Sequence, residues 1–277
     1  MEFIDFRSRH RSPRIELLFP GWSSGERVAF FSPHDDDVAL GAGYLLLATA
    51  KNGGTPSIFI FCSGDAGYST PEEKATIVST RKKEAVAAYG DLGVDKKNII
   101  FFDIPDFSLM GATSREAPAG KSLFDRIVIF FRTMKISRVV FPSGHYEHWD
   151  HTAAFYHGIY TSPQAGDPIL ADLGTPQTIS SYFIYSVWGD FEPSSARDKG
   201  VRGDCGILAP KRQEMAVRKA LSCFVSQGKI MQNTVAMLRD RRKTRAGYLE
   251  LYKKAGVREP IDFGPYFRML GNCRKIR

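Results

Sequence analysis

Short, almost continuously apolar runs alternate with longer helix-like segments over the first 190 residues of this chain. The apolar runs cover residues 28–32, 56–63, 98–103, 138–142 and 181–188, and the helix-like segments cover 40–51, 71–89, 122–134 and 149–160. Continuous rather than alternating apolar runs favour strands that are covered on both faces, as in parallel sheets. Strands that alternate with helices predict βαβ units. We therefore expect an α/β fold with a Rossmann-like, mostly parallel sheet and helices on both faces.

The C-terminal part of the chain has a different pattern. Residues 163–178 and 190–209 are rich in turn-forming residues, which predicts loops. Residues 211–226 and 227–254 carry apolar residues at roughly helical spacing, which predicts two helices. We therefore expect residues 1–209 to form the α/β domain. Residues 210–277 are expected to form a basic helical C-terminal extension packed on the same domain.

The positive charge of the chain lies in its C-terminal third. Residues 191–277 hold 20 Lys and Arg against 8 Asp and Glu, hence +12, while residues 1–190 hold 18 against 22, hence −4. A solvated helical face is the simpler interpretation, and an anionic substrate, nucleic acid or membrane surface is the alternative. The basic residues are not interleaved with exposed-looking aromatics and form no RNA-binding signature. We therefore expect no nucleic-acid partner.

The four cysteines are scattered without the C-x-x-C spacing of a zinc knuckle or a redox motif. This usage favours a reducing compartment. The first 20 residues carry charges throughout and lack the apolar core of a signal peptide. No apolar run reaches 18 residues, so we expect no membrane span and a cytoplasmic location. The sequence leaves the oligomeric state open.

Two clusters of imidazoles and carboxylates follow two of the predicted strands. Residues 34–37 read His-Asp-Asp-Asp just after the run 28–32, and residues 148–151 read His-Trp-Asp-His just after the run 138–142. Ligands of open parallel sheets bind at the carboxyl ends of the strands, so the two clusters are expected to meet there. Three successive acids would repel one another unless a cation sits among them. The pattern predicts a metal site with the nitrogen and oxygen ligands that a hydrolytic metal needs.

These residues resemble the motifs of the LmbE-like, or PIG-L, family of zinc-dependent N-deacetylases. Residues 32–43 resemble the first motif of that family, usually Pro-His-Pro-Asp-Asp followed by a Leu-Gly or Ile-Gly pair, and residues 148–151 resemble its His-x-Asp-His motif. Secondary marks at 63–67, 81–84, 104–106 and 226–227 agree, so the resemblance spans roughly residues 27–230. The chain departs from the family at Asp35, where Pro is usual, and at 38–39, where many members carry a glutamate. The resemblance implies that residues 1–209 form a deacetylase-like catalytic domain.

The resemblance also implies roles for individual residues. The Zn²⁺ ligands would be His34, Asp37 and His151. Asp36 would be the general base for the attacking water, and His148 would stabilise or protonate the tetrahedral intermediate. Asp150 would orient a neighbouring histidine. General chemistry supports this set, because two imidazoles and one carboxylate leave a fourth zinc position for water.

Each assignment has a structural alternative. The acids could cap the next helix, with Asp150 as the N-cap of a helix that begins near Thr152, and Asp35 is expected to be solvated or capping. The candidate substrate-binding residues are Arg81, Asp106 and Tyr146. The first two could instead form a structural salt bridge and a turn, and the tyrosine could pack at the base of its loop. The aromatic cluster at 182–188 is expected to pack in the core, with stacking of Trp188 on a sugar as the alternative.

The sequence thus indicates a metal-dependent N-deacetylase. By resemblance, its partner would be a small N-acetylated sugar of the GlcNAc type or its conjugate, and the basic C-terminal third hints at an anionic moiety. One alternative is a Mg²⁺-dependent phosphoryl-transfer protein built on the acids at 35–37, which would leave the histidines unexplained. The other is a non-enzymatic binding protein that uses its basic C-terminal face.

Overall fold

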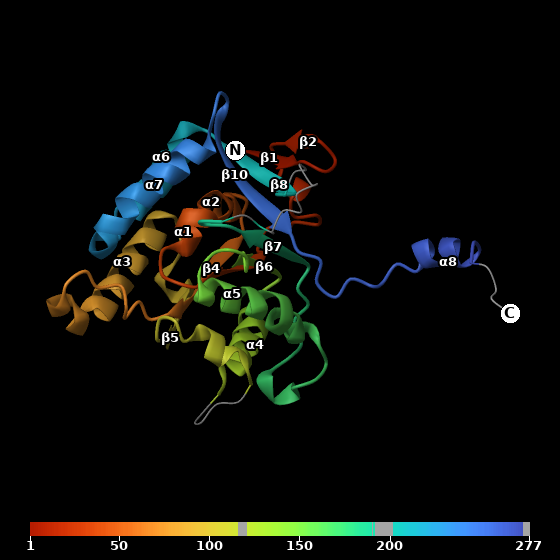
Figure 1. Ribbon diagram of the computed structural model, residues 1–277, viewed down its shortest axis with the longest axis horizontal. Coiled ribbons are helices and arrows are strands. Elements are labelled where there is room, and N and C mark those ends of the chain that lie inside the picture. Colours follow the sequence, from red (N-terminus) through yellow and green to blue (C-terminus); the bar gives the residue numbers. More distant parts are fainter. Residues whose placement is uncertain (116–120, 190, 192–201, 274–277) are drawn as a thin grey trace.

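The computed structural model describes residues 1–115, 121–189, 191 and 202–273, and Figure 1 shows their arrangement around one large sheet. The strands of its parallel half lie in the order β7-β6-β3-β4-β5. Their bounds are β3 Arg27–Ser32, β4 Thr55–Cys62, β5 Ile99–Ile104, β6 Arg138–Pro142 and β7 Ser181–Tyr185. All five coincide with the predicted apolar runs to within a few residues. The predicted α/β class, with a parallel core, is confirmed.

An antiparallel half extends this sheet, and the sequence did not predict it. Beyond β7 the order continues β10-β8-β1-β2, and β9 pairs only with β10. The bounds are β1 Glu2–Asp5, β2 His10–Ser12, β8 Cys205–Ala209, β9 Lys243–Thr244 and β10 Gly247–Lys254. Two expectations were therefore wrong: residues 205–209 are a strand rather than loop, and 247–254 are a strand rather than the end of a helix. The rest of the predicted loop, at 190 and 192–201, lies outside the described residues.

The strand β10 was misread because its composition suits a helix. Its sequence, Gly-Tyr-Leu-Glu-Leu-Tyr-Lys-Lys, contains Leu, Glu and Lys, all of which have good helix propensity. It nevertheless forms a strand, because it lies between β8 and β7 and pairs with both. Pairing in the folded sheet thus overrides the helix propensity of its residues. Residues of the C-terminal third thus contribute a strand to the central sheet.

The helices begin close to where their capping residues lie. Ser122 caps α4 by accepting a hydrogen bond from the Asp125 amide, and Thr70 opens a capping box before a short 3-10 turn, Pro71–Ala75. The helices are α1 Asp37–Gly41, α2 Gly43–Lys51, α3 Ile77–Asp91, α4 Leu123–Met134, α5 Trp149–Tyr156, α6 Lys211–Leu221, α7 Gly228–Arg242 and α8 Gly264–Leu270. A π-helical turn, His157–Thr161, continues α5. These bounds match the predicted helices, except that 40–51, 71–89, 211–226 and 227–254 are each divided. No separate helix was predicted at the position of α8.

Side-chain alternation along the central strands builds two cores, one on each face of the sheet. In β3, Val28 and Phe30 belong to one buried cluster, whereas Ala29 and Phe31 belong to the other. The first cluster packs against α2, α3, α6 and α7, and the second packs against α4 and α5. Both faces are therefore covered, as the continuous apolar runs predicted. The rigid core fixes the loops that leave the carboxyl ends of the parallel strands.

The C-terminal helix α8 lies apart from this body in Figure 1, at the end of an extended segment. Its aromatic residues Tyr266 and Phe267, and Phe263 just before it, are each more than half exposed. Among the described residues, no helix is both long enough and apolar enough to cross a membrane.

Candidate metal centre and active site

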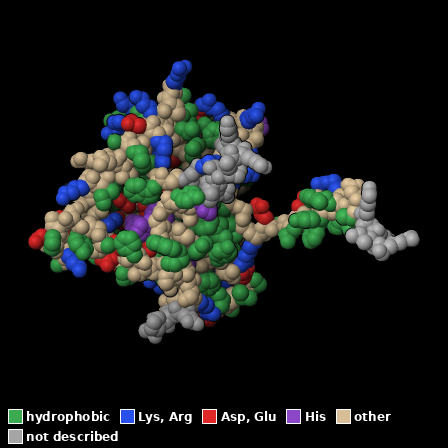
Figure 2. Space-filling model, viewed as in Figure 1, with side chains coloured by type: hydrophobic (Ala, Val, Ile, Leu, Met, Phe, Trp, Pro, Cys, Tyr) green, Lys and Arg blue, Asp and Glu red, His purple; other side chains and the backbone are tan. Residues whose placement is uncertain are grey.

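Four adjacent parallel strands deliver the candidate residues to one edge of the sheet. The loop after β3 carries residues 34–37, the loop after β6 leads to 148–151 at the start of α5, and the loops after β4 and β5 carry 64–67 and 106–107. Together with α7 they line a pocket of about 450 Å³. Figure 2 shows histidine side chains gathered in a hollow of the face in view. The structure therefore brings the two clusters together at the strand ends, as the sequence predicted.

His34, Asp37 and His151 converge in this pocket. The Asp37 Oδ2 atom lies 3.3 Å from His34 Nδ1 and 3.1 Å from His151 Nε2, and it accepts a hydrogen bond from the His34 amide at 2.8 Å. One potential ligand atom from each of the three lies within 4.8 Å of the others. Two imidazole nitrogens and one carboxylate oxygen around one point fit a catalytic metal that keeps a position for water. The structure brings the predicted ligand set together, and the role of each member stays a prediction.

A second set of potential ligands, His34, Cys62 and Asp106, shares the same histidine. Burial raises the pKa of the Cys62 thiol strongly, and the nearby Asp150 and Asp106 carboxylates raise it further. A thiol must lose its proton to bind a metal, so this environment disfavours Cys62 as a ligand. Of these two donor sets, the one with Asp37 is therefore the better candidate.

The protonation equilibria of the three converging residues follow from their contacts. Burial opposes the charged carboxylate of Asp37, but His151 and His34 outweigh it and hold the pKa of Asp37 well below its usual range. Burial likewise opposes an imidazolium at His151, yet Asp37 and Glu147 raise the pKa of His151 to about 9. The pKa of His34 is also raised, against burial, by Asp150 and Asp37. The pocket is thus a strongly negative environment that attracts cations.

Asp36 is the carboxylate of the cluster that lacks a partner. Its side chain accepts no hydrogen bond within the described parts of the chain, whereas Asp35 and Asp37 are both held. Burial raises the pKa of Asp36 to about 7, with further contributions from the Asp35 and Asp37 carboxylates. A carboxyl group tuned to near neutrality beside a metal site is suited to general-base work.

Asp150 is completely buried and contacts two histidines of the site, His34 and His148. Its Oδ2 atom lies 3.4 Å from His34 Nε2 and 3.4 Å from His148 Nδ1, and its carboxylate also accepts the amide hydrogens of Phe107 and Leu109. These contacts fit the predicted orienting role. The alternative, that Asp150 is the N-cap of this helix, is wrong, because the cap of α5 is His148, whose Nδ1 accepts from the Asp150 amide at 3.2 Å. Burial and the neighbouring His34 lower the pKa of His148.

Arg81 and Asp106 both line the pocket, but each has structural partners. The Arg81 guanidinium is buried against Asp35, with both carboxylate oxygens 3.1 Å from Nε. The expectation that Asp35 is solvated was wrong, since it is 5% exposed. Asp106 accepts the amides of Gly64 and Ala66 at 2.8 and 3.1 Å. Arg81 therefore relieves part of the repulsion that the three acids create.

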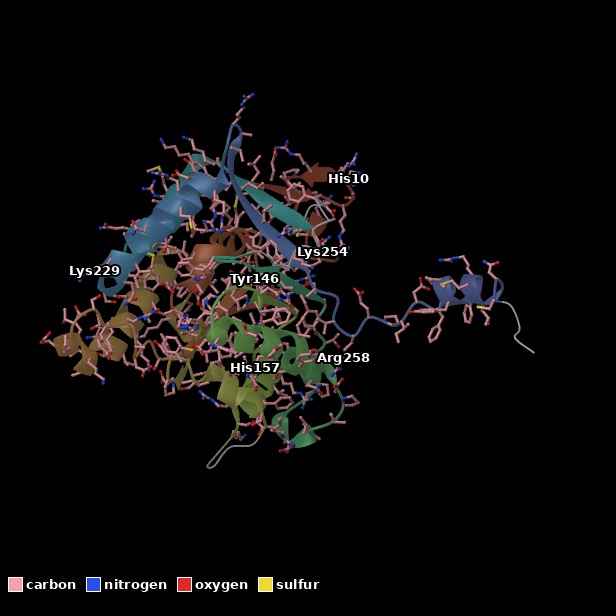
Figure 3. All side chains as sticks on the ribbon, in the orientation of Figure 1. His10, Tyr146, His157, Lys229, Lys254 and Arg258 are labelled. Carbon is pink, nitrogen blue, oxygen red and sulfur yellow. The ribbon has the colours of Figure 1, made fainter. Side chains whose placement is uncertain are left out.

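The rim of the pocket is aromatic. Phe107, Tyr146 and Trp188 line it, with 64%, 76% and 46% of their surface exposed. Tyr146 does not pack at the base of its loop, because its side chain is exposed to solvent. Its backbone has a positive φ of 56°. The core-packing expectation holds for Phe183 and Tyr185 but was wrong for Trp188. In the view of Figure 3, Tyr146 lies near the middle of the molecule, far from His10 at its N-terminal edge.

Sequence reasoning missed the pocket residues Glu147, Phe107 and Ile230, and it noted Gln227 only within a secondary mark of the resemblance. Glu147 stands four residues before His151 and contacts its Nδ1 atom at 2.6 Å. A carboxylate one helical turn from a candidate ligand histidine is a signal that could have found it. Phe107 and Ile230 carry no local motif, because the fold brings them to the pocket from distant segments.

Comparison with known proteins agrees with this geometry. The family model for PIG-L, GlcNAc-PI de-N-acetylase, matches residues 29–159, a segment that contains both clusters. The sequence of residues 29–159 is therefore similar to the PIG-L family. No curated protein matches the sequence.

Solved structures share the fold of this chain beyond the matched segment. An N,N'-diacetylchitobiose deacetylase from Pyrococcus horikoshii has a TM-score of 0.69 at 18% identity, covering 87% of this chain and 89% of its own. GalB, the 4-carboxy-2-hydroxymuconate hydratase of Pseudomonas putida, has a TM-score of 0.64 at 18% identity, covering 86% of this chain and 99% of its own. A triple mutant of a deacetylase of teicoplanin biosynthesis has a TM-score of 0.60 at 16% identity, covering 83% of this chain and 97% of its own. At such identities the likeness shows the fold, and a hydratase among these structures means that the fold alone does not choose the reaction.

Proposed function

We propose that the protein is a zinc-dependent N-deacetylase that removes the N-acetyl group from a GlcNAc-type sugar or its conjugate. The observation that carries the proposal is the convergence of His34, Asp37 and His151 beside the unpartnered carboxylate of Asp36. This arrangement lies in the segment that matches the PIG-L family model. It supplies what metal-assisted amide hydrolysis needs, namely a ligand set with an open position and a base beside it.

The donor set favours zinc over magnesium. Imidazole nitrogens suit zinc, whereas magnesium prefers carboxylates, carbonyls and water. A bound zinc ion would lower the pKa of a coordinated water and polarise the carbonyl of the substrate amide. The Mg²⁺-dependent phosphoryl-transfer alternative is not favoured, because it leaves the two candidate ligand histidines without a role.

The chain's own residues would then move the protons. Asp36, with its pKa near 7, would take a proton from the attacking water. His148 stands at the mouth of the same pocket and would stabilise or protonate the tetrahedral intermediate as the amine leaves. Asp150 contacts His34 and His148 and would keep both rings in the required orientation.

Substrate recognition would fall to the pocket wall and rim. Arg81 and Asp106 are proposed to contact sugar hydroxyls or an anionic group from positions fixed by their structural partners. Tyr146, whose side chain is exposed at the rim, is proposed to donate a hydrogen bond to the developing oxyanion or to the sugar. The other exposed rim rings, Phe107 and Trp188, offer apolar faces on which a sugar ring could stack.

Acetate release tests this proposal. Zinc-loaded protein is incubated with N-acetylglucosamine, N,N'-diacetylchitobiose and GlcNAc-inositol conjugates, and Asp36→Asn is compared with the unchanged chain. We expect acetate from at least one substrate, and a rate about 10²–10⁴-fold lower in Asp36→Asn while bound zinc is retained. Asp172→Asn, in an exposed 3-10 turn, is the matched control and should keep full activity. Equal rates for Asp36→Asn and the unchanged chain would contradict the assignment of the base.

A further inference from the structure

Glu147 connects the candidate metal site to the aromatic rim through one buried carboxylate. Its side chain has no exposed surface. The Oε2 atom contacts His151 Nδ1 at 2.6 Å. The Oε1 atom accepts hydrogen bonds from the Ser186 hydroxyl and from the amides of Val187, Trp188 and Gly189, at 2.8 to 3.2 Å. The two oxygens thus face two different parts of the site.

On the metal side, the contact fixes which nitrogen of His151 can bind an ion. When the ring is neutral, as ion binding requires, and donates its Nδ1 hydrogen to Glu147, its lone pair lies on Nε2, the atom 3.1 Å from Asp37. Ligand histidines generally depend on such a carboxylate for their tautomer and ring orientation. The position of Glu147 and the affinity of the site for an ion are therefore linked.

On the rim side, three successive amides that point at one oxygen make an anion-binding turn. This turn, residues 186–189, carries Trp188, and the Arg241 guanidinium donates to the Val187 carbonyl at 2.9 Å from the other side. A Cβ atom added at Gly189 would lie 3.2 Å from the Tyr146 carbonyl oxygen. The turn therefore packs closely on the loop that carries Tyr146, another aromatic residue of the rim. Without the Glu147 carboxylate, three amides at the pocket edge would lose their acceptor.

We propose that Glu147 is a positioning residue that couples ion capture by His151 to the placement of the rim turn, and hence of Trp188. An ion that fixes His151 also fixes Glu147, and the same carboxylate orders the turn that shapes the substrate entrance. The coupling is reciprocal, so an ordered rim strengthens ion binding by the same factor. The proposal rests on the proposed metal site but not on the hydrolytic step. It makes rim order, and with it substrate affinity, depend on the loaded state of the site.

Tryptophan fluorescence can report this coupling without any substrate. In a Trp22→Phe, Trp149→Phe background, Trp188 is the only tryptophan, and Zn²⁺ alone is titrated into metal-free protein while bound zinc is measured by equilibrium dialysis. We expect the emission of Trp188 to change and to saturate together with zinc binding. In Glu147→Gln we expect zinc affinity to fall about 10–100-fold, with little change of emission even at saturating zinc. Glu72→Gln, at an exposed position, is the matched control and should behave as the background does.

Ser186→Ala separates the two sides of the carboxylate, in case Glu147→Gln fails to fold. It removes the Ser186 hydroxyl, which contacts both the Glu147 carboxylate and the Gly189 carbonyl, and it leaves His151 untouched. The emission response should therefore shrink while zinc affinity stays within about 3-fold. Zinc binding without any change in Trp188 emission in the background protein contradicts the coupling alone. A full emission change in Glu147→Gln also contradicts it. Absence of zinc binding in the background protein overturns the proposed function and the coupling together.

Discussion

Both halves of the central sheet bury carboxylates, but they treat the charge differently. In the antiparallel half, Glu250 of β10 lies 2.5 Å from the Arg242 guanidinium of α7, and it accepts hydrogen bonds from the Tyr44 amide and the Tyr252 hydroxyl. At the carboxyl ends of the parallel strands, three successive aspartates face one guanidinium, that of Arg81.

The difference separates structural charge from charge kept for a ligand. The Glu250 cluster carries its own cation, the guanidinium of Arg242. The aspartate cluster uses Arg81 for Asp35 and two histidines for Asp37, and it leaves Asp36 without a hydrogen-bond partner in the described parts of the chain. Functional sites are where such unfavourable arrangements are tolerated.

The largest expected effect on stability comes from the antiparallel half. Glu250→Gln leaves the buried Arg242 without its counter-ion, and the free energy of unfolding should fall by about 3–5 kcal/mol. Urea denaturation followed by circular dichroism measures this loss. Glu72→Gln, at an exposed position, should change stability by less than about 0.5 kcal/mol. An unchanged midpoint in Glu250→Gln would show that the cluster is not the structural charge pair described above.

The second prediction compares two buried histidines on one helical segment. His151 lies between carboxylates, whereas His157 stacks on Phe61 and contacts the Thr161 hydroxyl. Burial lowers the pKa of His157 to about 4 from its usual 6.5. Between these values the unfolded chain binds more protons than the folded one, so this group's stability contribution is present above pH 6.5 and is lost as pH falls towards 4.

The loss attributable to His157 should reach roughly 2–3 kcal/mol between about pH 7 and pH 4.5. His157→Gln keeps a polar partner for Thr161 and removes the titration, so the stability of this variant should depend less on pH by that amount. Urea midpoints of the two proteins across this range provide the measurement. Parallel pH curves would mean that His157 is not a neutral core residue.

The smallest expected change in the free energy of unfolding is that of Asp36→Asn, and its sign is opposite to that of Glu250→Gln. Asp36→Asn removes a half-buried charge without a hydrogen-bond partner, so the metal-free variant should be as stable as the unchanged chain or more stable by up to about 1 kcal/mol. Thermal unfolding in the presence of a chelator measures this. Destabilisation by more than about 1 kcal/mol would place Asp36 among the structural carboxylates and remove the contrast between the two clusters.

Much of the site was predictable because it is local in sequence. The run of acids after β3 and the His-x-Asp-His segment after β6 each lie within four residues, and parallel topology requires their strand ends to meet. The apolar runs predicted the parallel strands for the same reason, since double-sided burial leaves a continuous apolar signature.

The parts that were missed depend on contacts between distant segments. β10 has helix-favouring residues and becomes a strand only because it pairs with β8 and β7. Trp188 leaves the core because Glu147, 41 residues earlier, holds its turn at the rim. Asp35 was expected to be solvated because nothing near it in sequence reveals the guanidinium of Arg81, 46 residues away.

Metal binding by metal-free protein tests the central claim most directly, namely that the charge left unpaired at the parallel strand ends is a cation site. Equilibrium dialysis with Zn²⁺ should give one ion per chain, undiminished by an about 100-fold excess of Mg²⁺. Asp37→Asn should lose this ion, whereas His10→Gln, on the exposed N-terminal edge, should keep it. Zinc retained at full stoichiometry and affinity in Asp37→Asn, or no zinc bound by the unchanged chain, would contradict the account.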